Sequence, residues 1–156
     1  MARIKIDLPD AFPFSVSIPV RITDINYGNH VGNDTILSLI HEARMQYLLQ
    51  YGYTEMEFAG VGLIMADAGI EFKNELYYGE TVIASVACAG FSKVSFELFY
   101  KLEKALHEEP ITNTGAKQGD KKILIAVAKT GMVCFDYKSK KIVQIPGKAV
   151  MKLTSL

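Results

Sequence analysis

Polar side chains of several kinds gather in one short stretch of this sequence, between residues 24 and 34. The stretch holds Asp24, Asn26, Tyr27, Asn29, His30, Asn33 and Asp34. Histidine changes its charge readily near neutral pH, so His30 is a candidate base or proton donor. Gly28 and Gly32 lie among these residues, and glycine lets main-chain N–H groups approach a ligand closely. These residue types could serve a catalytic or binding site, although a long turn held by its own Asn and Asp side chains would also explain them.

A change of hydrophobic period directly after this stretch predicts a long helix from about Asn33 to Tyr51. Apolar side chains recur there at spacings of three and four residues, which is typical of a helix. The recurring positions are Ile36, Ile40, Ala43, Tyr47 and Tyr51, with Leu37, Leu39 and Leu48 widening the stripe. Asn33 or Asp34 is expected to cap the start of the helix, and Gly52 to end it. The broad stripe and the few charges predict a helix largely enclosed by other structure.

The polar stretch therefore leads into the N-terminus of a buried helix. The first N–H groups of a helix have no partner inside it, and they can hold an anion or polarise a carbonyl group. The oxygen of a thioester or ester, which becomes an oxyanion when the carbonyl is attacked, would suit such a site.

The remaining pattern predicts strands. They are expected over residues 14–22, Leu63–Lys73, Thr81–Phe91, Ser95–Lys104 and Lys122–Asp136, with Ile142–Ile145 as the candidate for a short last strand before a tail from Pro146. Pro19 suggests that the first strand lies at an edge or a bulge. The turn-rich loop Ala105–Lys121 is expected to join two antiparallel strands.

This order of elements favours an antiparallel α+β fold, with one strand, one long helix, and then four or five strands in a meander. It excludes a parallel array of alternating strands and helices. A single sheet that curls around one helix covers most of the helix and leaves the other sheet face, or the sheet edges, exposed. Since an uncovered edge pairs readily with another chain, we expect a homodimer or a homotetramer.

The composition limits the class of protein. The chain has 156 residues, 49% of them hydrophobic, and its 17 basic and 17 acidic side chains balance. One domain over residues 1–156 is expected, and the neutral charge argues against a nucleic-acid partner. No apolar run is long enough to cross a membrane, and residues 1–10 lack the apolar stretch of a signal peptide. Cys88 and Cys134 lie far apart and outside any metal-binding spacing, so they are expected to be small core residues. The protein is expected to be cytoplasmic and to hold no metal or other cofactor.

Two parts of the sequence resemble a known family. The stretch from Arg21 to Asn33, followed by Glu42-Ala-Arg44, is similar to the hotdog-fold thioesterases of the 4-hydroxybenzoyl-CoA thioesterase type. The pattern of that family runs Asp-x-Asp-x-x-Gly-His-Val-Asn-Asn and then Glu-x-Ala-Arg, and plant-type acyl-carrier-protein thioesterases have a similar stretch. Three later parts of the sequence, Glu71-Phe72, Leu76 and residues 79–82, resemble the strand, loop and turn that follow in the family. The likeness therefore spans about residues 14–136.

The resemblance implies a fold and an activity. The fold would be a hotdog, in which an antiparallel sheet of five or six strands wraps around one long central helix. The activity would be hydrolysis of acyl-CoA or of an acyl-carrier-protein thioester, with the ligand lying between two subunits.

At several positions the chain departs from the family pattern. Asn26 stands where the family has its second Asp, often the catalytic carboxylate, and an amide cannot act as a general base at neutral pH. Asn29 replaces the Gly before the histidine, and Gly32 replaces the first Asn after the valine. Asn26 could still orient a water or hold the thioester oxygen, but a carboxylate, if one is needed, must come from elsewhere.

The candidate site comprises four catalytic residues, Asp24, Asn26, His30 and Glu42, and five substrate-binding residues, Tyr27, Gly28, Asn29, Asn33 and Asp67. Asp24 and Glu42 match family positions, yet each has a structural alternative. Asp24 could bond the loop backbone, and Glu42 could form a buried pair with Arg44 or with a loop amide. Asp67 lies in an otherwise apolar strand, where a buried acid needs a partner, and in a dimer it could reach the site of the neighbouring subunit. His41, beside Glu42, is expected to be structural.

Three functions remain open from the sequence. The first is an acyl-thioester hydrolase, in which a water oriented by a carboxylate or by His30 attacks the thioester carbonyl while helix N–H groups hold the oxyanion. The second is a hydratase or dehydratase of acyl thioesters on the same fold, which would need a His with a helical Glu or Asp. The third is a non-catalytic module that binds acyl thioesters, in which Asn26 marks lost catalysis.

Overall fold

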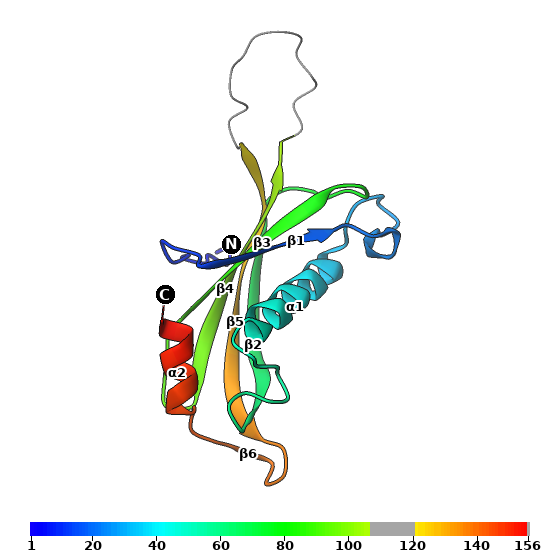
Figure 1. Ribbon diagram of the computed structural model, residues 1–156. Helices are drawn as coiled ribbons and strands as arrows, with labels where there is room; N and C mark the ends of the chain where they lie inside the picture. Colours follow the sequence, from blue (N-terminus) through cyan, green and yellow to red (C-terminus); the bar gives the residue numbers. More distant parts are fainter. Residues whose placement is uncertain (107–120, 156) are drawn as a thin grey trace.

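The computed structural model describes residues 1–106 and 121–155, which form an antiparallel sheet with a long helix packed against it (Figure 1). The described elements are β1 (Phe14–Pro19), the short 3-10 turn η1 (Ile22–Asp24), α1 (Asn33–Leu49), β2 (Gly62–Phe72), β3 (Thr81–Ala89), β4 (Ser95–Ala105), β5 (Lys122–Asp136), β6 (Lys141–Ile142) and α2 (Gly147–Thr154). The predicted long helix and the five longer strands are confirmed to within a few residues, and the sheet has six strands.

The strands lie in the order β1-β3-β4-β5-β2, with β6 pairing β5, and all pairs are antiparallel. The predicted meander is wrong in one place, because β2 pairs with β5 and not with β3. The chain between the edge strands β1 and β2 contains α1, so the helical segment carries the chain from one edge of the sheet to the other. Residues 73–80 then bring it back past β5 and β4. This pairing joins segments far apart in sequence, so no local pattern contains it.

Two local predictions about the sheet agree with this topology. β1 lies at an edge, as Pro19 suggested. β4 and β5 are antiparallel neighbours, as expected of strands joined by the loop Ala105–Lys121, although residues 107–120 of that loop lie outside the described residues.

Helix α1 presents one face to the sheet and the other to solvent. Its buried side chains are Ile36, Leu39, Ile40, Ala43, Arg44, Tyr47 and Leu48. The opposite face, which includes Leu37 and Leu49, is exposed. The prediction that the helix is largely enclosed is therefore wrong for a single chain, because the strands belong to one sheet and that sheet contacts one side of the helix.

The start of α1 also differs from the prediction. Gly32 is the N-cap, and its carbonyl accepts the Ile36 N–H at 3.1 Å. Among the residues that the structure describes, no side chain caps the helix. Asn33 and Asp34, the predicted caps, lie inside the first turn. At the other end, Gly52 has a φ of +77°, the left-handed conformation that ends a helix, as predicted.

The core lies between α1 and the inner face of the sheet. Phe96, Leu98 and Tyr100 point into it from β4 and are at most 1% exposed. Cys134 is buried, Cys88 is partly buried, and both thiols are free. Burial raises the pKa of Cys88 to about 12 and that of Cys134 to about 11, so both stay protonated at neutral pH. This agrees with their prediction as small core residues.

The C-terminal segment contains a helix that the sequence pattern does not predict. The tail expected from Pro146 is instead α2, which buries Ala149 and Leu153. Lys152 Nζ donates to the Tyr51 carbonyl at 3.1 Å, so α2 contacts the turn that follows α1. The strand candidate Ile142–Ile145 is reduced to β6. Within the described ranges, no helix is long and apolar enough to span a membrane.

Residues 1–13 form an extended arm over the outer face of the sheet, opposite α1 (Figure 1). The Ile6 N–H donates to Glu71 of β2 at 2.7 Å, and Lys101 Nζ of β4 lies 4.9 Å from the centre of the Phe12 ring. Phe99 and Val127 point to this outer face and are only 8% and 4% exposed. The outer face is therefore partly covered by the chain itself, whereas no strand of the described residues pairs with the free side of the edge strand β2.

Candidate functional site

The polar stretch between residues 24 and 34 folds into a tight turn. Ile25 and Val31 pair across it as an isolated antiparallel bridge, and the Asn26 N–H donates to the His30 carbonyl at 3.0 Å. The Asn26 side-chain oxygen accepts the Gly28 N–H at 2.8 Å, and Asn29 takes a left-handed conformation with a φ of +63°. Asn26 thus holds the turn through its own amide oxygen, as an Asn or Asp does in many turns.

Gly28 lets two functional side chains approach the same part of this turn. A Cβ atom at position 28 would lie 3.1 Å from both Asn26 Oδ1 and His30 Nε2, which is tighter than most real Cβ contacts. A side chain at this position would therefore push on both groups. The glycine is required by close approach, and not by an unusual backbone angle.

His30 is held in one tautomer. Its Nδ1 lies 3.0 Å from the Val31 carbonyl oxygen, and because a carbonyl only accepts, Nδ1 must carry a proton. Neutral His30 therefore presents Nε2 as an acceptor. This Nε2 lies 3.9 Å from Glu75 Oε1, and the His30 side chain keeps 29% of its surface exposed.

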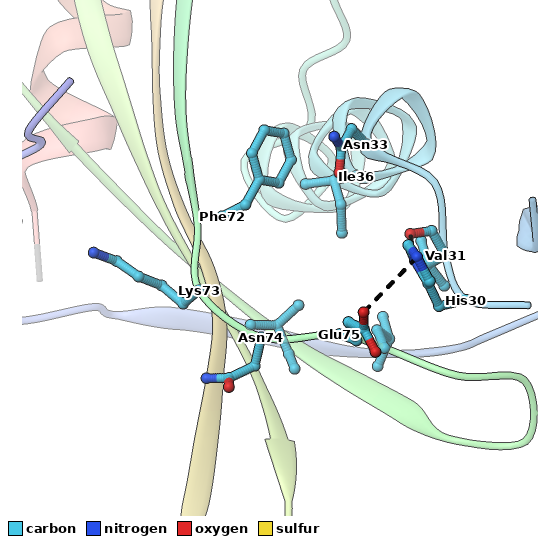
Figure 2. Close-up of a pocket in the computed structure, with 10 residues that line it drawn as sticks. His30, Val31, Asn33, Ile36, Phe72, Lys73, Asn74 and Glu75 are labelled. Atoms are coloured by element: carbon cyan, nitrogen blue, oxygen red, sulfur yellow. Dashed lines mark hydrogen bonds and ion pairs between the residues drawn. The ribbon is translucent and has the colours of Figure 1, made fainter. Parts of the chain in front are cut away.

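A hollow of about 230 Å³ lies between this turn, the start of α1 and the connection from β2 to β3 (Figure 2). Its lining residues are His30, Val31, Asn33, Ile36, Phe72, Lys73, Asn74, Glu75, Leu76 and Ile125. Half of them are apolar and half are polar or charged. In Figure 2, His30 and Glu75 point toward each other from the two sides of the hollow. The pocket thus combines an apolar surface with two groups that can bind or exchange a proton.

The start of α1 forms part of one wall of this pocket. Asn33, the first residue of the helix, lines the hollow. The N–H groups of the first turn cannot be satisfied within the helix, and no side chain caps α1. The N–H groups of Asn33, Asp34 and Thr35 are therefore suited to hold an oxygen that carries negative charge.

Asp24 is buried behind the turn and bound to Arg21. Its carboxylate accepts the Arg21 main-chain N–H at 2.8 Å and the guanidinium at 3.1 Å, and the residue is 4% exposed. Burial opposes ionisation of this carboxyl group, but the hydrogen bonds and charge of Arg21 outweigh it and hold the pKa of Asp24 below its ordinary value. Asp24 therefore bonds the backbone of the loop, which is the structural alternative that the sequence left open.

Glu42 and Asp67 lie away from the pocket lining. Glu42 is exposed on α1, accepts a hydrogen bond from Gln46 at 2.9 Å, and lines a separate groove between α1 and β1. Asp67 is exposed rather than buried, because it lies on the edge strand β2. Its Oδ1 accepts the Gly131 N–H at 3.1 Å, next to a bulge in β2.

The other predicted side chains divide between the pocket and solvent. His30 and Asn33 line the pocket, and Gly28 lies against His30. Tyr27 is fully exposed in the turn. The predicted structural residue His41 contacts Glu55 at 3.1 Å, outside the pocket.

The second wall of the pocket, residues 72–76, was not predicted from the sequence. Lys73, Asn74 and Glu75 form a polar run after an apolar strand, and such a run indicates only an ordinary loop. Their place beside His30 depends on β2 lying at the far edge of the sheet, from where the chain must cross back. Within residues 1–106 and 121–155, no three His, Cys, Asp or Glu side chains are grouped so that they could hold a metal ion.

The sequence profile of the thioesterase-like superfamily matches residues 20–153, a range that includes the turn, α1, β2 to β6 and most of α2. The chain belongs to the thioesterase-like superfamily. No curated protein sequence matches this superfamily member.

Solved structures of thioesterases have the same fold as this superfamily member. A 4-hydroxybenzoyl-CoA thioesterase from Pseudomonas sp. strain CBS-3 is 12% identical, with a TM-score of 0.72 over 90% of this chain and 99% of that chain. A mutant 4-hydroxybenzoyl-CoA thioesterase, with Asn in place of an Asp and in complex with 4-hydroxybenzoyl-CoA, is 11% identical, with a TM-score of 0.74 over 90% and 98% of the two chains. A 1,4-dihydroxy-2-naphthoyl-CoA thioesterase from Synechocystis is 18% identical, with a TM-score of 0.72 over 92% and 98%. The predicted hotdog fold, and the resemblance to the 4-hydroxybenzoyl-CoA thioesterase type, are confirmed.

Proposed function

We propose that this chain hydrolyses acyl thioesters, releasing a free acid and a thiol such as coenzyme A. The observation that carries the proposal is the pocket at the start of α1, where His30 and the first residue of the helix, Asn33, meet an apolar surface. Membership of the thioesterase-like superfamily supports the same chemistry. The substrate is an acyl-CoA or an acyl-carrier-protein thioester, the reaction needs no cofactor, and the whole chain, residues 1–156, acts as one thioesterase-like domain.

The geometry suggests how the reaction would proceed. The carbonyl oxygen of the thioester accepts hydrogen bonds from the first N–H groups of α1, which stabilise the negative charge that develops on it. His30 Nε2, an acceptor in the neutral ring, orients the attacking water. Asn26 holds the turn that carries His30, and Asp24 anchors the beginning of that turn through Arg21.

The choice of test substrates follows from the similar structures. They are named for thioesters of aromatic acids, 4-hydroxybenzoyl-CoA and 1,4-dihydroxy-2-naphthoyl-CoA. Phe72, Ile36 and Ile125 give this pocket an apolar part that could accept such a ring. Aromatic acyl-CoAs are therefore the first substrates to test, followed by straight and branched chains.

We propose that the active form is a homodimer or a homotetramer. One side of β2 has no strand partner among the described residues. Residues 65–68 along β2 are exposed with a single charge, which makes this edge suitable for pairing with a second chain. A partner would also cover the exposed face of α1 and complete the pocket. The two free cysteines support a reducing compartment, and we place the protein in the cytoplasm.

The test is release of free thiol from a panel of acyl-CoAs, measured spectrophotometrically. We expect turnover of at least one thioester, and a fall in kcat in both His30→Ala and Asn26→Ala. His30→Ala removes the group that orients the water, which should cost about 10²–10⁴-fold. Asn26→Ala removes a bond that holds the turn, so its fall in kcat should be smaller. If both folded variants keep the wild-type kcat, the site lies elsewhere.

A non-catalytic binding module is the second candidate, and the amide of Asn26 at the family's carboxylate position favours it. Such a module would bind acyl-CoA in calorimetry without releasing thiol. Because the module would lack only a base, Asn26→Asp should then confer hydrolysis. Turnover by the unmodified protein would exclude this second function.

A further inference from the structure

We propose that Glu75 is the catalytic base of this chain. Its carboxylate would accept the proton that the amide of Asn26 cannot accept. The inference rests on the proposed hydrolysis, and it identifies a residue that matches none of the family positions named above. Glu75 lies in the connection between β2 and β3 and enters the pocket from the side opposite the turn (Figure 2).

The contact between Glu75 and His30 is suited to holding a water. Neutral His30 presents an unprotonated Nε2, and the Glu75 carboxylate has only acceptors, so the two groups cannot hydrogen-bond directly. Their atoms Nε2 and Oε1 are 3.9 Å apart. A water can donate one hydrogen to each of two acceptors at this separation, with ordinary donor–acceptor distances of about 2.8 Å. Its oxygen lone pairs are then free to face the thioester carbonyl.

The two oxygens of the Glu75 carboxylate have different partners. The Tyr77 hydroxyl donates to Oε2, which fixes the rotation of the carboxylate, and Oε1 faces His30. The Glu75 side chain is 58% exposed, so solvent water reaches Oε1 from the mouth of the pocket. The carboxylate is thus oriented by the protein and still open to the reactant.

The backbone on either side of this contact is held rigidly. The Val31 N–H donates to the Leu76 carbonyl at 2.8 Å, so the residue after His30 is bonded to the residue after Glu75. Val31 and Leu76 are 4% and 1% exposed, which protects this bond from water. The Glu75 carbonyl accepts a hydrogen bond from Lys104 Nζ at 3.0 Å.

The rest of the connection is anchored to the ends of the neighbouring strands. The N–H groups of Lys73 and Asn74 both donate to the Ile125 carbonyl, at 2.9 and 3.2 Å. The Asn74 side chain donates to the Leu124 carbonyl at 2.7 Å, and Lys104 pairs with Glu80 at 2.8 Å. A residue in an ordinary surface loop would lack this support, and a base must be positioned to within a fraction of an ångström.

No other carboxylate named from the sequence has this position. Asp24 is buried and occupied by Arg21. Glu42 lines the groove beside β1, and Asp67 bonds Gly131 on the edge strand. Glu75 is the acidic residue that lines the pocket with His30.

The proposed step balances as follows. Glu75 Oε1 takes one proton from the water while the water oxygen forms a bond to the thioester carbonyl carbon. The π electrons of the carbonyl move to its oxygen, which the N–H groups of the α1 N-terminus stabilise. When the C=O bond re-forms, the C–S bond breaks and its electron pair leaves with sulphur. The thiolate takes the proton from Glu75, and the other proton of the water, held at His30, leaves with the acid.

The test compares Glu75→Gln with the unmodified protein in the thiol-release assay. Glutamine keeps the size of the side chain and its bond to Tyr77 but cannot accept a proton, so we expect kcat to fall by about 10²–10⁴-fold. Glu75→Asp, a shorter base, should retain more activity than Glu75→Gln. The matched control is Glu97→Gln on the outer face of the sheet, where Glu97 pairs with Lys129, and its kcat should not change.

A binding measurement and a double variant separate a catalytic role from a structural one. The Kd of a thioether analogue of the substrate, with CH₂ in place of the carbonyl, should change by less than about threefold in Glu75→Gln. Because both groups hold the same water, adding His30→Ala to Glu75→Gln should cost little more than either alone.

The proposal is overturned if Glu75→Gln keeps more than a third of the wild-type kcat, or if its loss of activity equals its loss of affinity. It is equally overturned if Glu42→Gln or Asp67→Asn, and not Glu75→Gln, abolishes turnover. These outcomes leave the hydrolase intact. If the unmodified protein releases no thiol from any thioester in the panel, the proposed function fails, and the role of Glu75 fails with it.

Discussion

Arg44 of α1 and Glu55 in the following loop form an ion pair, with Arg44 Nε 2.5 Å from Glu55 Oε1. The same guanidinium reaches the Tyr100 hydroxyl at 3.5 Å, and that hydroxyl lies 2.9 Å from Thr130 Oγ1 in β5. Only 6% of the Arg44 side chain is exposed. Since a buried charge needs a partner, this chain of contacts fixes how α1 lies on the sheet.

Removing Glu55 should therefore destabilise the fold. Glu55→Ala leaves the Arg44 charge buried without its partner, and we expect the free energy of unfolding to fall by about 3 kcal/mol. This is the lower end of the usual cost, because a quarter of the Glu55 side chain is already exposed. Urea denaturation measures the change. Glu42→Ala, at an exposed position on the same helix, is the control and should cost less than about 0.5 kcal/mol. Equal losses in the two variants would contradict the prediction.

The same pair predicts how stability depends on pH. Burial opposes ionisation of Glu55, but Arg44 outweighs it and lowers the pKa of Glu55 below the ordinary value of 4.5. The stabilisation is complete above that value and is lost as the pH falls through the lowered pKa. In Glu55→Gln, unfolding free energy should fall less steeply below pH 4.5 than in the wild type. Some slope must remain, since the pKa of Asp24 is also lowered. Parallel curves for the two proteins would exclude this role of Glu55.

The short helix α2 is expected to contribute to the stability of the core. Leu153 is 6% exposed and belongs to the main hydrophobic cluster, whereas Met151, two residues earlier, is 73% exposed. Leu153→Ala should lower the free energy of unfolding by about 2–3 kcal/mol, because it leaves a cavity. Met151→Ala should change it by less than about 0.5 kcal/mol. If thermal or urea unfolding does not separate the two variants, α2 is not part of the cooperative core.

The fold was largely predictable because most of its elements have strong local patterns. The spacing of Ile36, Ile40 and Ala43 predicts α1 without any knowledge of its partners, and the long strands alternate or are continuously apolar. α2 was missed because eight residues with two buried positions, Ala149 and Leu153, carry too short a pattern. The pairing of β2 with β5 was missed for another reason, since it depends on contacts between segments about sixty residues apart.

Only one side of the candidate site, the turn before α1, was predictable from the sequence. Asn26, Gly28 and His30 are close in sequence, so a single turn brings them together. Glu75 joins them through the crossing of residues 73–80, and no spacing in the sequence indicates that contact. Asp67 was expected to be buried because its neighbours are apolar, yet apolar residues on an edge strand are exposed until something pairs with them.

The unpaired edge of β2 predicts the mode of association. Ala66 and Ala68 are exposed there, and lysine at such positions prevents pairing between sheet edges. The double variant Ala66→Lys/Ala68→Lys should have at most half of the wild-type mass in light scattering, with the monomer at 17.3 kDa. Ser17→Lys, on the opposite edge strand β1, is the control and should keep the wild-type dimer contact. A wild-type protein that is monomeric at micromolar concentration would contradict the prediction directly.

Gly28 provides the most direct test of the geometry of the turn. In Gly28→Ala the new Cβ would lie 3.1 Å from His30 Nε2 and from Asn26 Oδ1, so both side chains must move by a few tenths of an ångström. A displacement of about 1 Å can cost 10²-fold in rate, and we therefore expect kcat to fall by about tenfold. Stability should change by less than about 1 kcal/mol, because the turn is at the surface.

The matched control for Gly28→Ala is Gly147→Ala at the first position of α2, where a Cβ meets no atom within 4 Å. Alanine favours a helix over glycine, so this variant should be as stable as the wild type or more so, with the same kcat. Both variants are compared in the thiol-release assay and in thermal unfolding. If Gly28→Ala keeps the wild-type kcat, His30 does not need its present position, and the water held between His30 and Glu75 cannot be the nucleophile. If it loses stability in proportion to activity, the turn has a structural role alone.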